Sequence, residues 1–146
     1  MFMGEYHHNI DEKGRIVLPG KFREIAKNSI VITRGLEKCL YLYTQEEWAK
    51  FVDKLSKLPF TKRDARTFMR SLFASATLCE FDRSGRINIT SPLVSYAGLT
   101  KECVIIGVND RIEIWDETLF NNFMLDNAEK IEDIAENLFE VSDETL

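Results

Sequence analysis

The chain has 146 residues, of which 45 % are hydrophobic and 29 % charged, a composition typical of one globular domain or two small ones that share a core. No run of eighteen apolar residues occurs, which excludes a membrane-spanning helix, and the chain begins without the basic and apolar segments of a signal peptide. We therefore expect a cytoplasmic protein. The net charge of −5 averages two unlike parts: residues 1–111 hold eighteen Lys and Arg against thirteen acids, and residues 112–146 hold one Lys against eleven. The body of the protein can thus attract a polyanion.

The first half of the chain reads as two strands joined by a turn, a short helix, two further strands joined by a turn, and two longer helices. Gly14 lies in the turn between the first two strands. Thr44 with Glu47, and Thr61 with Asp64, have the spacing of capping boxes that start helices. In chain order we expect strands at residues 6–10 and 15–18, a helix at 20–27, strands at 29–33 and 39–43, and helices at 44–58 and 61–71.

The second half repeats this order. Pro92 favours a helix start, and Asp116 is placed to cap a C-terminal helix, with apolar spacing that continues to about residue 139. We expect strands at residues 76–81 and 86–89, a helix at 91–97, strands at 103–108 and 112–115, helices after residue 116, and frayed residues 141–146.

The most informative feature is a polar turn that occurs twice. Residues 10–17 read I-D-E-K-G-R-I-V, and residues 81–88 read F-D-R-S-G-R-I-N. A unit of about forty residues buries too little surface to be stable alone. We therefore expect two repeats, at 1–75 and 76–146, that pair within the chain as one pseudo-two-fold α+β structure. Four residues recur seventy-one positions apart: Asp11, Gly14, Arg15 and Ile16 return as Asp82, Gly85, Arg86 and Ile87.

Each turn places an Asp and an Arg close enough for a charge-assisted hydrogen bond. One interpretation is structural: the Asp accepts backbone amides or holds the Arg, and so fixes the turn. The other is functional: a guanidinium beside further cations suits phosphate groups and guanine edges. The two interpretations are compatible. The further cations are Lys13 and Arg83 in the turns, supported by Lys21 and Arg23 in the helix that follows the first turn.

Support for an enzyme, a metal site or a cofactor is thin. His7 and His8 are adjacent, so on a strand they point to opposite faces, and no third ligand lies at a useful spacing. No nucleophile–base set and no Gly-rich phosphate loop occurs. Cys39, Cys79 and Cys103 form no C-x-x-C pair and are expected as buried thiols. We expect no catalytic residue, metal, cofactor or small-molecule substrate.

The whole arrangement resembles the MraZ family of bacterial transcriptional regulators, which are built from two AbrB-like swapped-hairpin units. The resemblance covers nearly the full chain. It rests on the Met-Phe-x-Gly start, both D-x-x-G-R motifs and the segments at residues 33–36, 39–40, 62–66, 89–92 and 103–115.

The resemblance implies a barrel-like core of interleaved hairpins with flanking helices, and arginines that face DNA. It implies double-stranded DNA with short direct repeats, upstream of the division and cell-wall gene cluster, as the partner. It also implies closed rings of several subunits and a nucleoid-associated location. Carried over by position, the DNA contacts are Arg15 and Arg86, and the motif residues that orient them are Asp11, Gly14, Asp82 and Gly85; Lys13 and Arg83 are added as contacts on charge alone.

Two other functions stay open. The chain could be an oligomeric protein-binding module whose arginines meet acidic surfaces, with the acidic C-terminal part occupying such a surface on a neighbouring subunit. It could also be an antitoxin-like regulator of the same fold that grips a toxin. The absence of a disordered toxin-wrapping tail makes this second alternative the weaker one.

Overall fold

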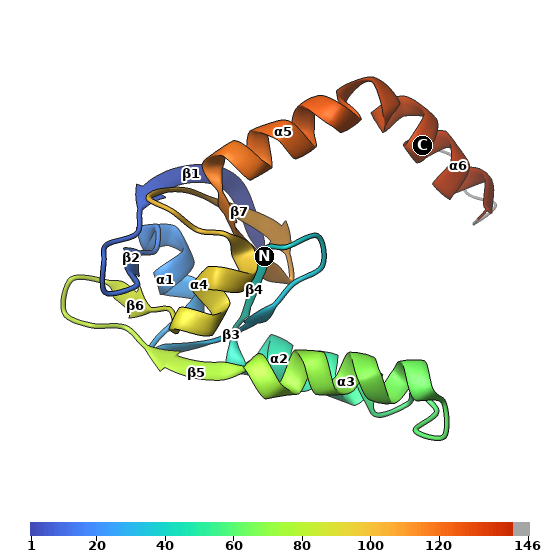
Figure 1. The fold of residues 1–146 in the computed structure, drawn as a ribbon, viewed down its shortest axis with the longest axis horizontal. Coiled ribbons are helices and arrows are strands. Elements are labelled where there is room, and N and C mark those ends of the chain that lie inside the picture. Colours follow the sequence, from blue (N-terminus) through green and yellow to red (C-terminus); the bar gives the residue numbers. More distant parts are fainter. Residues whose placement is uncertain (142–146) are drawn as a thin grey trace. The chain divides into compact units, whose positions relative to one another are not determined.

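The computed structural model describes residues 1–141 (Figure 1). The chain forms two compact units, Met1–Asp116 and Glu117–Leu146. The expected α+β fold with two repeated units is confirmed. The elements of the first unit are β1 (Phe2–Asn9), β2 (Arg15–Val17), α1 (Gly20–Ala26), β3 (Ser29–Arg34), β4 (Leu40–Tyr43), α2 (Gln45–Leu55), α3 (Arg63–Ser75), β5 (Thr77–Glu80), β6 (Arg86–Asn88), α4 (Ser91–Ala97), β7 (Glu102–Asn109) and β8 (Arg111–Asp116).

Six strands form one antiparallel sheet in the order β1-β7-β8-β4-β3-β5. This order reads the same from both ends once each strand is exchanged for its counterpart in the other repeat. The first strand of each repeat pairs with the third strand of the other, β1 with β7 and β5 with β3. At the centre Tyr41 of β4 lies opposite Glu113 of β8, seventy-two positions later. The two repeats therefore form one sheet, and the strands of each repeat need strands of the other repeat to complete their pairing.

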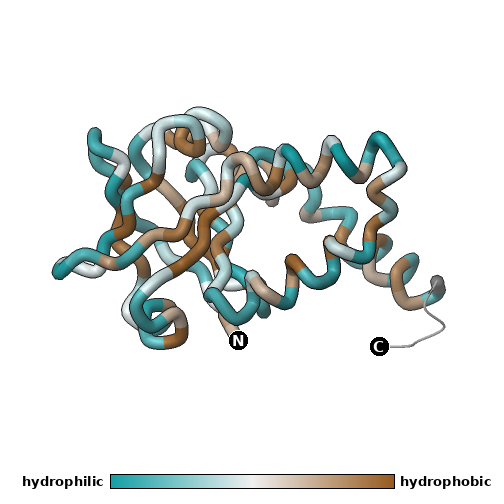
Figure 2. Tube along the Cα trace, turned by 90° about the horizontal axis from the view of Figure 1, so that it is seen from below, coloured by the Kyte–Doolittle hydropathy of each residue, from teal (hydrophilic) through white to brown (hydrophobic). Residues whose placement is uncertain are grey.

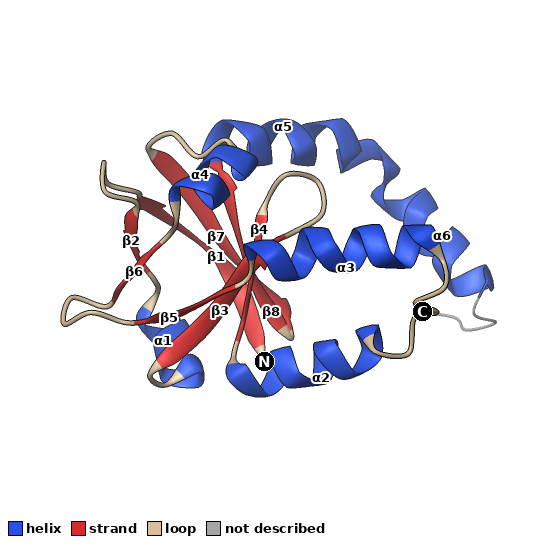
Figure 3. Cartoon of the chain, turned by 60° about the horizontal axis from the view of Figure 1, so that its bottom comes forward, coloured by secondary structure: helices blue, strands red, loops and turns tan. Residues whose placement is uncertain are grey.

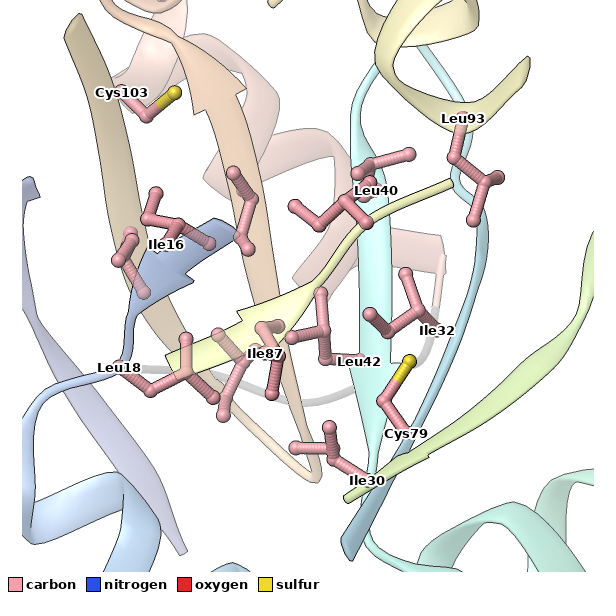
Figure 4. Close-up of a cluster of buried hydrophobic side chains, with 14 of the residues drawn as sticks. Ile16, Leu18, Ile30, Ile32, Leu40, Leu42, Cys79, Ile87, Leu93 and Cys103 are labelled. Atoms are coloured by element: carbon pink, nitrogen blue, oxygen red, sulfur yellow. The ribbon is translucent and has the colours of Figure 1, made fainter. Parts of the chain in front are cut away.

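The two short strands that follow the repeated turns form a separate ribbon, β2–β6, across one face of this sheet (Figure 3). Ile16 and Ile87 lie opposite each other in the ribbon and are 1 % and 0 % exposed. Their side chains lie in one continuous core with those of sheet residues such as Ile30, Ile32 and Leu42 (Figure 4). Burial of such aliphatic side chains stabilises a fold by roughly 1.5–3 kcal/mol each. In Figure 2 the segments through the middle of this unit are mostly hydrophobic and the projecting turns hydrophilic.

The expected barrel-like core is wrong in one respect, because the sheet is not closed. β1 and β5 are the two edges of the six-stranded sheet and do not pair with each other. Closure of a barrel requires hydrogen bonding between the first and last strands. After β1 the chain passes through the first repeated turn into β2, and after β5 it passes through the second into β6. The β2–β6 ribbon therefore covers one face of an open sheet.

The other face of the sheet carries α2 and α3. Thr33 of β3 is fully buried there, and its hydroxyl donates to the carbonyl of Leu72 in α3 at 2.6 Å. The ring of Tyr43 stacks on Phe51 with centroids 5.1 Å apart, and Trp48 meets Phe73 at 5.6 Å. These aromatic side chains thus pack between strands and helices.

Of the two predicted helix starts before α2 and α3, one holds. The hydroxyl of Thr44 accepts the amide of Glu47 at 3.0 Å, as the capping box requires. α3, however, begins after Lys62, whose side chain forms no cap, so the predicted box at Thr61 is wrong. The carbonyls of Phe60 and Thr61 accept instead from the guanidinium of Arg66, both at 3.0 Å. The loop is therefore held from within the helix.

The second unit contains α5 (Glu117–Asn127), a short 3-10 helix (Ala128–Lys130) and α6 (Ile131–Val141). Acidic residues occupy the first turn of α6, and its apolar residues Ile131, Ile134 and Leu138 are exposed. Apart from Val141, the expected frayed end lies outside the described residues. Within residues 1–141, no helix has both the length and the apolar character to cross a membrane.

The three cysteines are buried, with exposures of 1 % for Cys39, 8 % for Cys79 and 0 % for Cys103. Burial raises the pKa of the Cys39 and Cys79 thiols above their ordinary value, because a thiolate loses its hydration there. Both groups are therefore poor nucleophiles in the folded protein.

Candidate nucleic-acid interface

The first repeated turn, residues 11–15, joins β1 to β2 and is held together by one carboxylate. Oδ1 of Asp11 accepts the amides of Lys13 at 2.9 Å and Arg15 at 2.8 Å, and Oδ2 accepts Nε of Arg15 at 2.7 Å. The backbone closes the same loop, with the amide of Gly14 donating to the carbonyl of Asp11 at 3.0 Å. A single Asp thus fixes both the turn and the direction of its Arg.

The second repeated turn, residues 82–86, joins β5 to β6 with the same set of bonds. Oδ1 of Asp82 accepts the amides of Ser84 and Arg86, each at 2.9 Å, and Oδ2 accepts Nε of Arg86 at 2.8 Å. The amide of Gly85 donates to the carbonyl of Asp82 at 3.0 Å. In both turns the aspartate thus accepts backbone amides and holds its Arg, as the structural interpretation predicts.

These hydrogen bonds lower the pKa of Asp11 and Asp82 below the ordinary value of a carboxyl group. The largest cause at each is the backbone amide of the Arg four residues on, and the bond from the same guanidinium adds to it. Because the pKa in the folded state is depressed, this stabilisation is present above the pKa of the unfolded chain. It is lost as the pH falls through the folded pKa.

We expect a carboxyl titration followed by nuclear magnetic resonance to place the pKa of both groups below the ordinary value of an aspartate. The amide signals of Arg15 and Arg86 should move with the same midpoints, because those amides bond the titrating oxygens. A pKa of Asp11 or Asp82 at or above the ordinary value of an aspartate would show that the turns open in solution.

The ribbon places the two arginines on one outward face. Arg15 pairs with Asn88 and Arg86 with Val17, one position to either side of the buried Ile16–Ile87 pair. Since neighbouring residues of a strand point to opposite faces, Arg15 and Arg86 share the face away from the core. Their side chains are 34 % and 32 % exposed. In residues 1–141 their Nη groups make no hydrogen bond, so each guanidinium keeps donors for a ligand.

Two glycines allow the ribbon and the turns to meet closely. Gly14 and Gly85 have φ angles of +83° and +76°, which side chains other than glycine adopt at a cost. The carbonyl of Gly14 accepts the amide of Ile89 at 2.7 Å, and that of Gly85 accepts the amide of Leu18 at 3.2 Å. Each turn is thereby bonded to the strand end of the other repeat, which couples the two arginines through the backbone.

The other predicted cations lie in or beside the two turns and differ in their contacts. Lys13 and Arg83 are exposed in the turns, and neither forms an ion pair within the described residues. Arg23, predicted only as a supporting cation off the apolar face of its helix, reaches from α1 to Gly85, the backbone next to Arg86. Lys21 is exposed on the same helix. The contact of Arg23 joins residues far apart in the chain, and no sequence signal specifies it.

His7 and His8 show no arrangement suited to a metal. The imidazole Nε2 of His7 lies 2.8 Å from a carboxylate oxygen of Glu5 on the same strand. Across the described residues, no group of three or more His, Cys, Asp and Glu side chains converges as metal ligands would.

Comparisons with known proteins agree on one family. The MraZ family model, described as "MraZ protein, putative antitoxin-like", matches the chain twice, at residues 1–71 and 72–142. The transcriptional regulator MraZ of Lactobacillus helveticus (strain DPC 4571) is 53 % identical over 141 residues, which cover 97 % of this chain and 99 % of that protein. Because the family model covers nearly the whole chain in two copies, the chain belongs to the MraZ family.

Proposed function

We propose that this protein is a sequence-specific DNA-binding transcriptional regulator that contacts DNA through Arg15 and Arg86. The observation that carries the proposal is the pair of identically bonded turns on one ribbon, each with the Nη groups of its Arg unbonded on the outward face. A guanidinium with a fixed direction can bond a phosphate or a guanine edge in two places at once. The similar protein of Lactobacillus helveticus bears the name of a transcriptional regulator, in accord with this role.

The roles of the neighbouring residues follow from their charges. Asp11 and Asp82 orient the arginines, and Gly14 and Gly85 give the turns their shape. Lys13 and Arg83 add phosphate contacts from the same turns. Such contacts release counterions from DNA, so binding should weaken steeply as salt rises, with a slope of about −0.9 per phosphate contacted.

We further propose that residues 1–75 and 76–146 are two AbrB-like swapped-hairpin repeats. The exchange of β1 and β5 between the repeats supports this topology. In the cell we expect a cytoplasmic, nucleoid-associated ring of several copies on short direct repeats upstream of the division and cell-wall gene cluster. A single subunit offers a small basic surface, and linked copies on successive repeats raise the apparent affinity through effective concentration.

Selection of binding sites from randomised double-stranded DNA tests this function. We expect enrichment of one short word, present more than once at a fixed spacing and in a constant orientation. The same selection with the Arg15→Ala, Arg86→Ala double variant is the control and should enrich nothing. A flat profile for the natural protein would contradict sequence-specific binding and would favour the protein-binding alternative, in which the arginines meet an acidic partner.

A further inference from the structure

The two turns have the same bonds but different surroundings. Positions seventy-one apart correspond in the two repeats, so Val94 of α4 is the counterpart of Arg23 of α1. In the same way Glu12 of the first turn corresponds to Arg83 of the second. Both differences move positive charge towards the second turn, and a third, Lys13 against Ser84, moves one charge the other way. The pseudo-two-fold symmetry of the backbone is therefore broken in the side chains.

Arg23 is held against the second turn by its own hydrogen bond. Its Nε donates to the carbonyl of Leu18 at 3.0 Å, the residue whose amide bonds Gly85. The guanidinium lies against Gly85, with Cζ only 2.6 Å from the point where a Cβ atom would stand. Among residues 1–141 its Nη groups bond nothing and no carboxylate lies within ion-pair distance, unlike Arg86, whose charge is offset by Asp82.

The corresponding place beside the first turn is open. A hollow of about 230 Å³ lies there, lined by Asp11, Lys13, Gly14, Ser91, Val94 and Thr100 among others. The short side chain of Val94 leaves this space unfilled where Arg23 fills the other. Residues 11–15 hold two acids and two bases, whereas residues 82–86 hold one acid and two bases, to which Arg23 adds a third base.

We propose that Arg23 is a phosphate-contacting residue that makes the second turn the stronger of the two DNA contacts, so that each subunit reads its site in one direction. This inference rests on the proposed function. A two-fold symmetric DNA-binding surface matches a palindromic site, because the symmetry of the site mirrors that of the protein. The uneven charge makes the two ends of the ribbon different. A DNA sequence that is repeated in a constant orientation requires a binding surface whose two ends differ in this way.

The test compares Arg23→Val, which installs the counterpart residue, with Arg23→Lys, which keeps the charge. Binding of the full-length protein to the selected repeat DNA is titrated at several salt concentrations. We expect Arg23→Val to lower affinity about five- to tenfold and to reduce the salt slope by about 0.9, the loss of one phosphate contact. Arg23→Lys should stay within about twofold of the natural protein, because an ammonium group still binds a phosphate as a point charge. Arg86→Ala should weaken binding more than Arg15→Ala.

Two outcomes overturn the inference and leave the function standing: an unchanged affinity and slope for Arg23→Val, or a loss for Arg15→Ala as large as that for Arg86→Ala. If Arg15→Ala, Arg86→Ala and Arg23→Val all leave binding unchanged, the proposed function itself fails. If Arg23→Val does not fold, the variant Val94→Arg in the otherwise natural chain tests the inference. A guanidinium placed over the hollow should steepen the salt slope by about 0.9, and an unchanged slope would overturn the inference.

Discussion

Replacing Arg15 and Arg86 together by alanine should reduce DNA affinity at least about thirtyfold while the protein stays folded. An arginine that bonds a base edge or phosphate contributes roughly 1–3 kcal/mol, so the pair contributes roughly 2–6 kcal/mol. The turns should survive, because the backbone amides of Lys13 and Ser84 still bond the two aspartates. A mobility-shift titration against repeat-containing DNA measures the loss, and thermal unfolding checks the fold.

The control removes two cations from a place outside the ribbon. Lys54 and Lys57 lie in and just after α2, and their replacement by alanine changes the net charge by the same amount. Lys57 is 76 % exposed and lies 3.8 Å from Asp53, a surface ion pair of little consequence for stability. A loss of affinity in this control equal to that of the arginine variant would mean that only total charge matters. The arginines would then have no special role.

How much of this site the sequence predicts depends on the distance along the chain over which each contact acts. The bonds from Asp11 to Arg15 span four residues, and a local Asp-x-x-Gly-Arg pattern is enough to predict them. The equivalence of Ile16 and Ile87 follows from the repeat, because an internal duplication gives both the same place in their units. These predictions rest on local chemistry and on self-similarity.

Other features depend on packing between distant segments and were missed or wrong. The contact of Arg23 with Gly85 has no counterpart in the second repeat, so duplication could not reveal it. The expected barrel-like core is wrong in that the sheet stays open, because the twist and width of the whole sheet decide whether β1 and β5 meet. The error at Thr61 is local instead: α3 begins after Lys62, and Arg66 bonds the backbone carbonyls of Phe60 and Thr61. Spacing alone does not fix the residue at which a helix begins.

Gly14→Ala should destabilise the protein by on the order of 3 kcal/mol, whereas Gly20→Ala, six residues further on, should change stability by less than about 0.5 kcal/mol. At Gly14 a Cβ atom would collide with the carbonyl oxygen of Ile89, which is backbone and cannot turn aside, and the φ of +83° adds strain. At Gly20 the nearest atom is the tip of Arg23 at 3.6 Å, an ordinary contact at the start of a helix.

Thermal unfolding of the two variants measures the contrast, and a loss of this size corresponds to a Tm roughly 10 °C lower for a domain of this length. The carbonyl of Gly14 also accepts the amide of Ile89, so a shift that relieves the collision breaks a bond between the repeats. The effect should therefore reach DNA binding through both turns, and not through the mutated one alone. Equal Tm values for the two alanine variants would show that the first turn relaxes without cost. The backbone coupling of the two arginines would then be absent in solution.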